Sequence, residues 1–283
     1  MGLKKIAWVT DSTAYITEDL KNHPDVFVMP LAIIFGDVVY EDGISLTTEQ
    51  LYEKIKQSKE VPKTSQPAVG KFVELYEKLK NDYEQAIAIH ISSKLSGTLD
   101  SSRSASEMAE FPVEIIDSKS MSYAITSLLN TGIELSEQGM DGEMIAKKLR
   151  EEADKGENYI LLGSLEQFYK GGRMSGTQFL LGNLLQIKPI IRINQNGEFE
   201  VFEKVRSEKK AVRRLLELVN NAYNEHSIGE VQIMHGNVRE KAIALEKEIK
   251  NKYPNMNIVI GEISSTIAAH AGEGTVAIIW QNK

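Results

Sequence analysis

Short apolar runs rich in β-branched residues alternate with longer amphipathic stretches along the whole chain of 283 residues. Apolar runs of about four to eight residues are typical of buried strands, and the stretches between them have the period of a helix. Strands buried on both faces and separated by helices indicate an α/β protein with mainly parallel sheets. The expected strands are 6–10, 26–31, 86–91, 113–116, 159–163, 189–193, 231–235, 257–262 and 275–280, and the expected helices include 49–57, 69–79, 120–138 and 207–223.

Two short stretches break this alternation and are predicted to be hairpins. They are residues 34–38 and residues 192–198, the second of which carries an Asn-Gly turn. One hairpin in each half, in a chain longer than most single domains, predicts two domains, each with a mainly parallel sheet flanked by helices. The polar segment 150–158 is the best boundary candidate, so we expect an N-terminal domain at 1–155 and a C-terminal domain at 156–283.

Composition and charge exclude several classes of function. The net charge of −7 argues against nucleic acid or an anionic membrane as the main partner, and the absence of cysteine excludes disulfides and thiolate sites. The first residues lack the apolar run of a secretion signal, and no stretch has the roughly 18 apolar residues of a membrane span. We therefore expect a cytoplasmic protein, and a monomer because no large apolar surface stripe is evident.

Polar loops after the expected strands are the places to look for chemistry, since ligands of α/β sheets gather beyond the carboxyl ends of strands. The strongest candidate is Ser96-Gly97-Thr98, which leads into a helix beginning near Thr98. Hydroxyls and free N–H groups at a helix start suit an oxyanion, and glycine allows close approach. The alternative is that Ser96 only caps its helix.

Three further loops each allow two interpretations. Thr64-Ser65-Gln66-Pro67 is either an exposed hydroxyl–amide loop at a site, or the start of a helix whose first residue is Pro67. The glycine pair between Lys170 and Arg173 suits a phosphate or a carboxylate, or else it caps a helix. His270, which precedes two spaced glycines, is either a polar ligand contact or a core histidine with a satisfied partner.

Several catalytic motifs are missing from the sequence. It has no P-loop, no Gly-x-Gly-x-x-Gly after the first strand, no Gly-x-Ser-x-Gly elbow and no His-Glu-x-x-His zinc motif. Asp11 and Asp117 could bind magnesium or act as acid and base, but acceptance of backbone hydrogen bonds at strand ends is the favoured interpretation. No metal site is expected.

Taken in order, these loops resemble the DegV family over essentially the whole chain. Each motif is common by itself, but seven in series form a specific signal. The matching segments are Val9-Thr10-Asp11-Ser12-Thr13, Thr64-Ser65-Gln66-Pro67, Ser92-Ser93-Lys94-Leu95-Ser96-Gly97-Thr98, Asp117-Ser118-Lys119, Lys170-Gly171-Gly172-Arg173, Lys188-Pro189-Ile190 and His270-Ala271-Gly272-Glu273-Gly274.

The resemblance implies a lipid-binding protein that is not itself an enzyme. It implies two α/β domains with one long-chain fatty acid, such as palmitate, stearate or oleate, in a channel between them, and no cofactor. It also implies the role of binding subunit of a bacterial fatty-acid kinase, which makes acyl phosphate for phospholipid synthesis, with at most transient membrane contact. The residues it assigns to the ligand are Thr64, Ser65, Ser96, Gly97, Thr98 and His270, with Arg173 and Arg206 facing the kinase.

Burial energies are consistent with such a ligand. A tail of about 15 methylenes is worth about 12 kcal/mol at about 0.8 kcal/mol each, against an association cost of about 4–15 kcal/mol. The tail therefore drives binding, and the polar loops orient the carboxylate. Two other hypotheses remain open, namely a small-molecule phosphotransferase or hydrolase, and a regulatory interaction protein without lipid. Apolar candidates for a channel lining, or for ordinary core, are Leu165, Phe168, Phe179, Leu180, Leu184 and Leu185.

Overall fold

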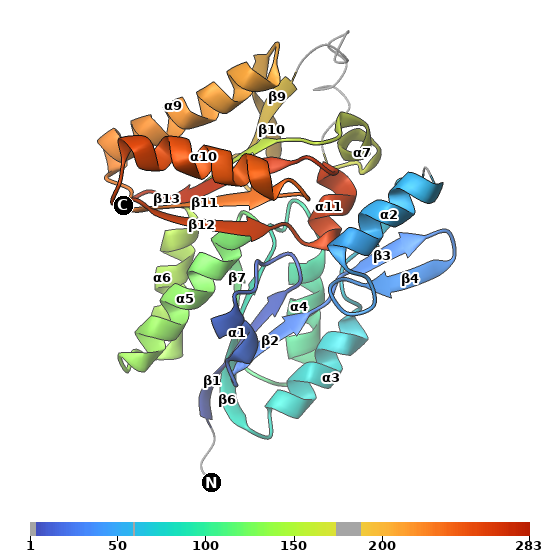
Figure 1. Ribbon diagram of the computed structural model, residues 1–283. Helices are drawn as coiled ribbons and strands as arrows, with labels where there is room; N and C mark the ends of the chain where they lie inside the picture. The colour runs from blue at the N-terminus through green and yellow to red at the C-terminus, as the bar shows by residue number, and fades with distance from the viewer. Residues whose placement is uncertain (1–3, 59, 174–187) are drawn as a thin grey trace.

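A parallel four-stranded sheet forms the lower half of the molecule in Figure 1. The computed structural model describes residues 4–58, 60–173 and 188–283. All neighbouring strands of this first sheet run in the same direction, which confirms the parallel α/β prediction here. In sheet order the strands are β2 (Val26–Met29), β1 (Lys4–Asp11), β6 (Tyr83–His90) and β7 (Val113–Asp117), and the short helix α1 (Glu18–Asn22) joins β1 to β2.

Helices cover both faces of the first sheet. Ala86 and Ala88 pack on one face with residues of α3 (Val69–Leu79) and α4 (Thr98–Met108). Ile87 and Ile89 pack on the other face in the same core cluster as residues of α5 (Tyr123–Glu137) and α6 (Gly142–Ala153). Because successive side chains of a strand point to opposite faces, a strand covered on both sides needs an unbroken apolar run. That is the pattern from which β6 was predicted.

A small antiparallel sheet lies beside the first and contains the predicted hairpin at 34–38. Its order is β4 (Val38–Glu41), β3 (Ala32–Phe35) and β5 (Lys63–Ser65). Helix α2 (Thr48–Ser58) connects β4 to β5, and Thr47 and Gln50 exchange the two hydrogen bonds of a capping box at its start.

Both interpretations of the segment 64–67 need correction. Thr64 and Ser65 belong to strand β5, where they pair with Ile33 and Ala32, and are not part of an exposed loop. The helix that follows begins at Val69 after an N-cap at Ala68, so Pro67 is not its first residue. Backbone pairing with β3 creates this strand, and a polar run of three residues has no hydrophobic period that could reveal it.

The second sheet has six strands and differs from the prediction. Only β11 and β12 run parallel, and the other four neighbouring pairs are antiparallel, so "mainly parallel" is wrong for this half. The apolar runs report burial on both faces but carry no information on strand direction. In sheet order the strands are β10 (Phe199–Val205), β9 (Lys188–Ile193), β8 (Gly156–Leu161), β13 (Val276–Gln281), β11 (Glu230–His235) and β12 (Asn257–Glu262).

The two faces of the second sheet have different neighbours. Helices α9 (Glu208–His226) and α10 (Arg239–Lys252) cover its outer face, and the Ser207 side chain caps α9 by accepting from the Lys210 N–H. The inner face is directed toward the first half of the chain, with the short helices α7 (Leu165–Lys170) and α11 (Ser265–Ala271) at one end of the sheet (Figure 1).

One core cluster joins residues of both larger sheets, including Ile89 on β6 and Ile160 on β8. Helix α6 ends at Ala153 and β8 begins at Gly156, but the division of the chain at residues 155 and 156 stays a prediction. Among the helices of the described residues, none is both long and apolar enough to cross a membrane.

Candidate functional site

A cavity lies between the inner face of the second sheet and the loops at the carboxyl ends of the first. The empty space inside it, counted together with its opening to solvent, is ≈ 780 Å³. Most of its lining is apolar, from alternate residues of β8 and β13 and from α7 and α11. The polar residues Thr64, Ser65, Ser96, Arg173 and His270 also line it.

Thr64 and His270 meet directly at the cavity although they are far apart in the sequence. The Thr64 hydroxyl lies 2.8 Å from Nε2 of His270. Burial, together with the nearby charge of Arg173, lowers the pKa of His270 to about 4, so the ring is neutral near pH 7. The structure therefore brings together two residues that the sequence assigned to one site.

The other ring nitrogen of His270 identifies the favoured tautomer. Nδ1 is buried and has no hydrogen-bond partner among the described residues. An unpaired buried N–H is rarer than an under-used acceptor, so the favoured tautomer carries its proton on Nε2. Nε2–H then donates to the Thr64 oxygen, which leaves the Thr64 O–H as a donor for a ligand in the cavity.

The glycine pair after Lys170 both ends a helix and makes room for His270. The N–H of Gly171 donates to the Gln167 carbonyl at 2.8 Å, and Gly172 has a φ of +68°, so the helix-capping interpretation is confirmed. A Cβ on Gly171 would come within 2.2 Å of Nδ1 of His270. A side chain larger than that of glycine at this position would therefore push the imidazole out of place.

The three residues at the start of α4 differ in role, as N-cap, cavity lining and buried support. Gly97 is the N-cap, so Ser96 is not the capping residue, and the Ser96 side chain lines the cavity. The Ser96 hydroxyl accepts from the Thr98 N–H at 3.3 Å and lies 2.9 Å from the Thr98 hydroxyl. Thr98 is fully buried behind Ser96 and is not part of the lining.

Gly97 lets the α4 loop approach strand β5. A Cβ at Gly97 would come within 3.0 Å of the side-chain nitrogen Nε2 of Gln66, the residue that follows Ser65. This contact places the segment that carries Thr64 next to the segment that carries Ser96. The two hydroxyl groups of the sequence-based hypothesis therefore line the same cavity.

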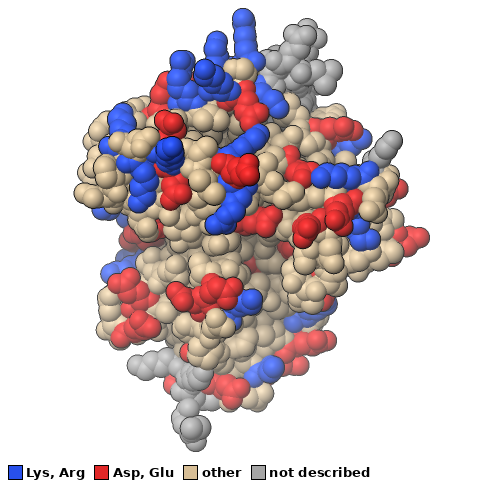
Figure 2. All heavy atoms as spheres, in the orientation of Figure 1, with Lys and Arg blue, Asp and Glu red and all other residues tan. Residues whose placement is uncertain are grey.

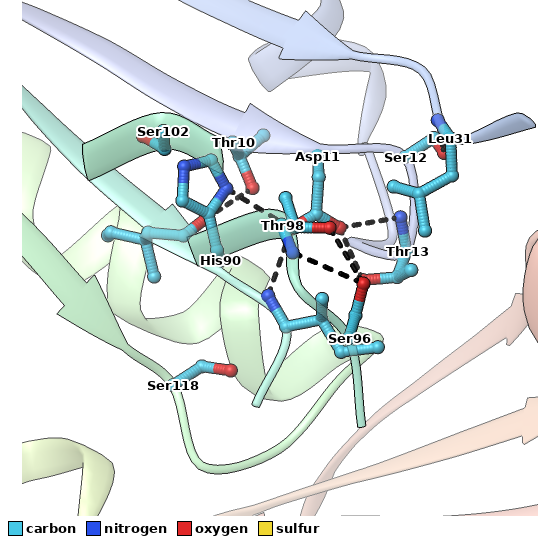
Figure 3. A network of polar contacts seen from close by, with 12 residues as sticks. Thr10, Asp11, Ser12, Thr13, Leu31, His90, Ser96, Thr98, Ser102 and Ser118 are labelled. Atoms are coloured by element: carbon cyan, nitrogen blue, oxygen red, sulfur yellow. Dashed lines mark hydrogen bonds and ion pairs between the residues drawn. The ribbon is translucent and has the colours of Figure 1, made fainter. Parts of the chain in front are cut away.

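A buried carboxylate holds the loops after β1 and β6 together (Figure 3). Asp11 accepts hydrogen bonds from the N–H groups of Thr13 (3.0 Å) and Ile91 (2.9 Å), and its Oδ2 lies 3.2 Å from Nδ1 of His90. Asp117 similarly accepts from the N–H of Lys119 at 2.8 Å. Backbone acceptance, which the sequence favoured for both aspartates, is confirmed. In the described part of the chain no cluster of metal-ligating side chains occurs.

The two arginines assigned to the partner-facing side differ in position. Arg173 lines the cavity, and it donates to the Gly171 carbonyl at 2.5 Å. Partial burial lowers the pKa of Arg173 from its usual value. Arg206 is exposed between β10 and α9 and does not line the cavity. The structure therefore groups Arg173 with the polar residues, but not Arg206.

Sequence reasoning missed several lining residues. Asn158 on β8 and Ser122 before α5 line the cavity, as does Phe199 on β10. Period-two spacing in β8 marks Asn158, Ile160 and Leu162 as one face, but nothing local shows that this face borders a cavity. Of the six apolar candidates, Phe168 lines it and Leu165 packs against the core. The others, Phe179, Leu180, Leu184 and Leu185, lie outside the described residues.

Comparison with known sequences gives the family. The model of the family described as "Uncharacterised protein, DegV family" matches residues 5–283. The protein DegV of Bacillus subtilis is 34% identical over 277 residues, which cover 97% of this chain and 98% of that protein. The chain belongs to the DegV family.

Solved structures of relatives share the fold over their full length. A fatty-acid-binding DegV family protein of Streptococcus agalactiae has a TM-score of 0.91 at 33% identity and covers 99% of both chains. DegV of B. subtilis, described as a fatty acid binding protein, has a TM-score of 0.89 at 33% identity, with 99% of this chain and all of the other covered. The Fatty Acid Kinase (Fak) B3 protein of Streptococcus pneumoniae, loaded with linoleic acid, has a TM-score of 0.85 at 21% identity and shows the fold alone.

Proposed function

We propose that this protein binds one long-chain fatty acid in the cavity, with its carboxylate at Thr64 and Ser96. The observation that carries this proposal is an apolar cavity whose polar residues include two hydroxyls, one of them oriented by a neutral histidine. The fatty-acid-binding descriptions of the S. agalactiae and B. subtilis relatives support it. The family resemblance suggests an acid such as palmitate, stearate or oleate.

The apolar lining of the cavity supplies the affinity for the acyl tail, and its polar residues bind the carboxylate. Each buried methylene contributes about 0.8 kcal/mol, so the tail supplies most of the affinity. A carboxylate without donors in such a site would cost several kcal/mol, and the hydroxyls of Thr64 and Ser96 prevent that cost. Ser65, which also lines the cavity, and the first turn of α4 after Gly97 border the same place.

The second part of the proposal is that a separate kinase phosphorylates the bound carboxylate in the cytoplasm. Neutral donors satisfy a carboxylate while leaving a lone pair for attack on ATP, whereas a bidentate arginine would occupy both oxygens. This chain then acts as a monomeric binding subunit and transfers no phosphoryl group. The motif resemblance supports the kinase step.

A basic surface beyond the C-terminal end of β10 suits an approaching kinase. Arg206 is exposed there, and Lys204, Lys209 and Lys210 are exposed around it. Figure 2 shows Lys and Arg side chains gathered along the upper edge of the molecule, over α9. We propose that Arg173, at the cavity, and Arg206, on the outer surface, both face the approaching kinase.

Mass spectrometry of the purified, denatured protein tests the lipid itself. A tight carrier should release one C14–C18 acid per chain, a length range that the family resemblance suggests. A regulatory protein without lipid would release none, even after incubation with oleic acid. Release of no fatty acid after this incubation would contradict the proposal.

A double variant tests the role of the hydroxyls. Thr64→Val with Ser96→Ala keeps the shape of the site, so we expect fatty-acid binding to weaken about 100-fold or more, from loss of two hydrogen bonds to a charged group worth about 1.5–3 kcal/mol each. Acyl-phosphate formation with added kinase should be lost even at saturating fatty acid. Ser58→Ala, which removes an exposed hydroxyl on α2, is the matched control. Unchanged phosphorylation in the double variant would contradict the assignment, and turnover without kinase would favour an enzyme.

A further inference from the structure

A buried asparagine side chain lies on the second-sheet side of the cavity, among apolar lining residues. Asn158 lies on β8 with 2% of its surface exposed, and it lines the cavity on the same strand face as Ile160 and Leu162. Across the sheet it pairs with Ile279 of β13, which also lines the cavity. Asparagine is seldom found fully buried unless its amide is satisfied.

The amide of Asn158 is only half satisfied by the described residues. Its Nδ2 is 3.4 Å from the Ser120 hydroxyl, and its Oδ1 is buried without a partner. Exchanging the amide oxygen and nitrogen would not help, because Ser120 would then satisfy the oxygen and leave the NH₂ group unpaired. In either orientation one polar atom of the amide has no partner among the described residues, where the side chain meets the cavity.

Ser122 adds a hydroxyl to the same lining. It precedes α5, but its side chain does not cap that helix. Its backbone has φ 60° and ψ −132°, a conformation that favours glycine and is strained for other residues. The contacts that hold it are a hydrogen bond from its N–H to the Thr13 carbonyl at 3.0 Å and a bridge with Ala14.

We propose that Asn158, with Ser122, forms a second polar subsite that accepts a hydroxyl group on the acyl chain, so that the cavity prefers a mid-chain hydroxy fatty acid. This rests on the proposed fatty-acid function and specifies the substrate class. An alcohol both donates and accepts, so it satisfies whichever half of the Asn158 amide is free. A site with a buried polar group also discriminates against a ligand that leaves the group unpaired.

The strand geometry places this subsite along the chain of the ligand. Leu162 follows β8 at the end where Ser164 donates to the Ala271 carbonyl, next to His270. Asn158 precedes Leu162 by four residues, which is about 13 Å along a strand. An extended peptide covers about 3.6 Å over the three backbone bonds of each residue, which is about 1.2 Å per bond. We apply the same length per bond to an extended acyl chain. The hydroxyl should therefore lie on the order of ten bonds from the carboxyl carbon.

The test compares ricinoleic acid, which carries a mid-chain hydroxyl, with oleic acid, which lacks it. Displacement of a fluorescent fatty acid from the full-length protein gives both affinities. We expect ricinoleic acid to bind about 5- to 30-fold more tightly, the equivalent of one or two hydrogen bonds. In Asn158→Leu, which keeps the shape of the side chain, the preference should reverse, because the leucine offers no partner to the hydroxyl.

Two controls make the outcome specific. Ile160→Leu on the same strand face should change both affinities by a similar factor and leave the preference intact. The second control compares stearic acid with α-hydroxystearic acid, whose hydroxyl is beside the carboxylate. Asn158→Leu should change the affinities of these two acids by the same factor. Equal binding of oleic and ricinoleic acids to the unmodified protein, as expected if a water molecule satisfies Asn158, would overturn the subsite alone. Failure to bind either acid would instead remove the proposed function.

Discussion

Two histidines in this protein have similar hydrogen-bonding environments, but only one of them lines the cavity. His90 and His270 each have one ring nitrogen near an oxygen partner and another that is buried without a partner among the described residues. The partner of His90 is Asp11, a fully buried carboxylate whose oxygens accept from two backbone N–H groups and the Thr13 hydroxyl. The partner of His270 is Thr64, whose hydroxyl lines a cavity.

The difference shows what separates a structural polar cluster from a candidate site. Around Asp11 the donors already belong to the protein, so the cluster closes on itself and fixes the loops after β1 and β6. Around Thr64 the chain of donors stops at a hydroxyl that faces open space, so it requires a partner from outside. Because both histidines have a ring nitrogen without a partner among the described residues, the feature that distinguishes the Thr64 pair is a hydroxyl that lines a cavity.

The largest effect on folding should come from Asp11→Ala. This change leaves the N–H groups of Thr13 and Ile91 and the His90 ring without their acceptor, at about 1–3 kcal/mol for each unpaired buried donor. We expect the free energy of unfolding, measured with denaturant, to fall by about 3–5 kcal/mol. Asp117→Ala, which removes an acceptor at the more exposed end of β7, should cost less than half as much. Equal losses in the two variants would show that the Asp11 cluster has no special role.

The next effect is a pH dependence of stability to which His270 contributes. Its folded pKa of about 4 is below the ordinary value of 6.5, so the unfolded chain binds a proton more readily between these values. Stability should therefore be complete above pH 6.5 and fall as the pH decreases toward 4, by about 3 kcal/mol from this group.

His270→Gln isolates that contribution. The difference in unfolding free energy between protein and variant should change by about 3 kcal/mol between pH 7 and pH 4. Other groups, such as Asp42, whose pKa is raised by burial, are present in both proteins and cancel in the difference. A difference that stays constant with pH would mean that His270 is protonated equally well in the folded state, contrary to its position at the cavity.

The smallest effect should come from Thr98→Val, which changes the support of Ser96 without touching the cavity. Loss of the hydroxyl contact at 2.9 Å should cost about 1 kcal/mol of stability. Fatty-acid affinity should fall only a few-fold, because Ser96 keeps its hydroxyl but loses its orientation. Calorimetric titration with oleic acid measures this change, and a loss as large as that of the Thr64→Val, Ser96→Ala double variant would place Thr98 in direct contact with the ligand.

The sequence by itself predicted most of the longer strands and five of the polar residues that line the cavity. Burial on both faces leaves an unbroken apolar run, so β6 and β13 could be recognised locally, and the Asn-Gly turn marked the hairpin of β9 and β10. Ser96 and Arg173 stand beside glycines whose backbone freedom is visible in the sequence. The order of these motifs also gave the family.

Only the tertiary structure decided which of these groups meet. Strand direction in the second sheet, the pairing of Thr64 with Ile33 and the contact between Thr64 and His270 depend on residues far apart in the chain. A local sequence pattern indicates burial and the periodicity of a helix or strand. It does not show which residues from distant parts of the chain lie opposite one another in the fold. For the same reason Asn158, an ordinary polar residue in a strand by sequence, became significant only when the fold placed its amide against the cavity.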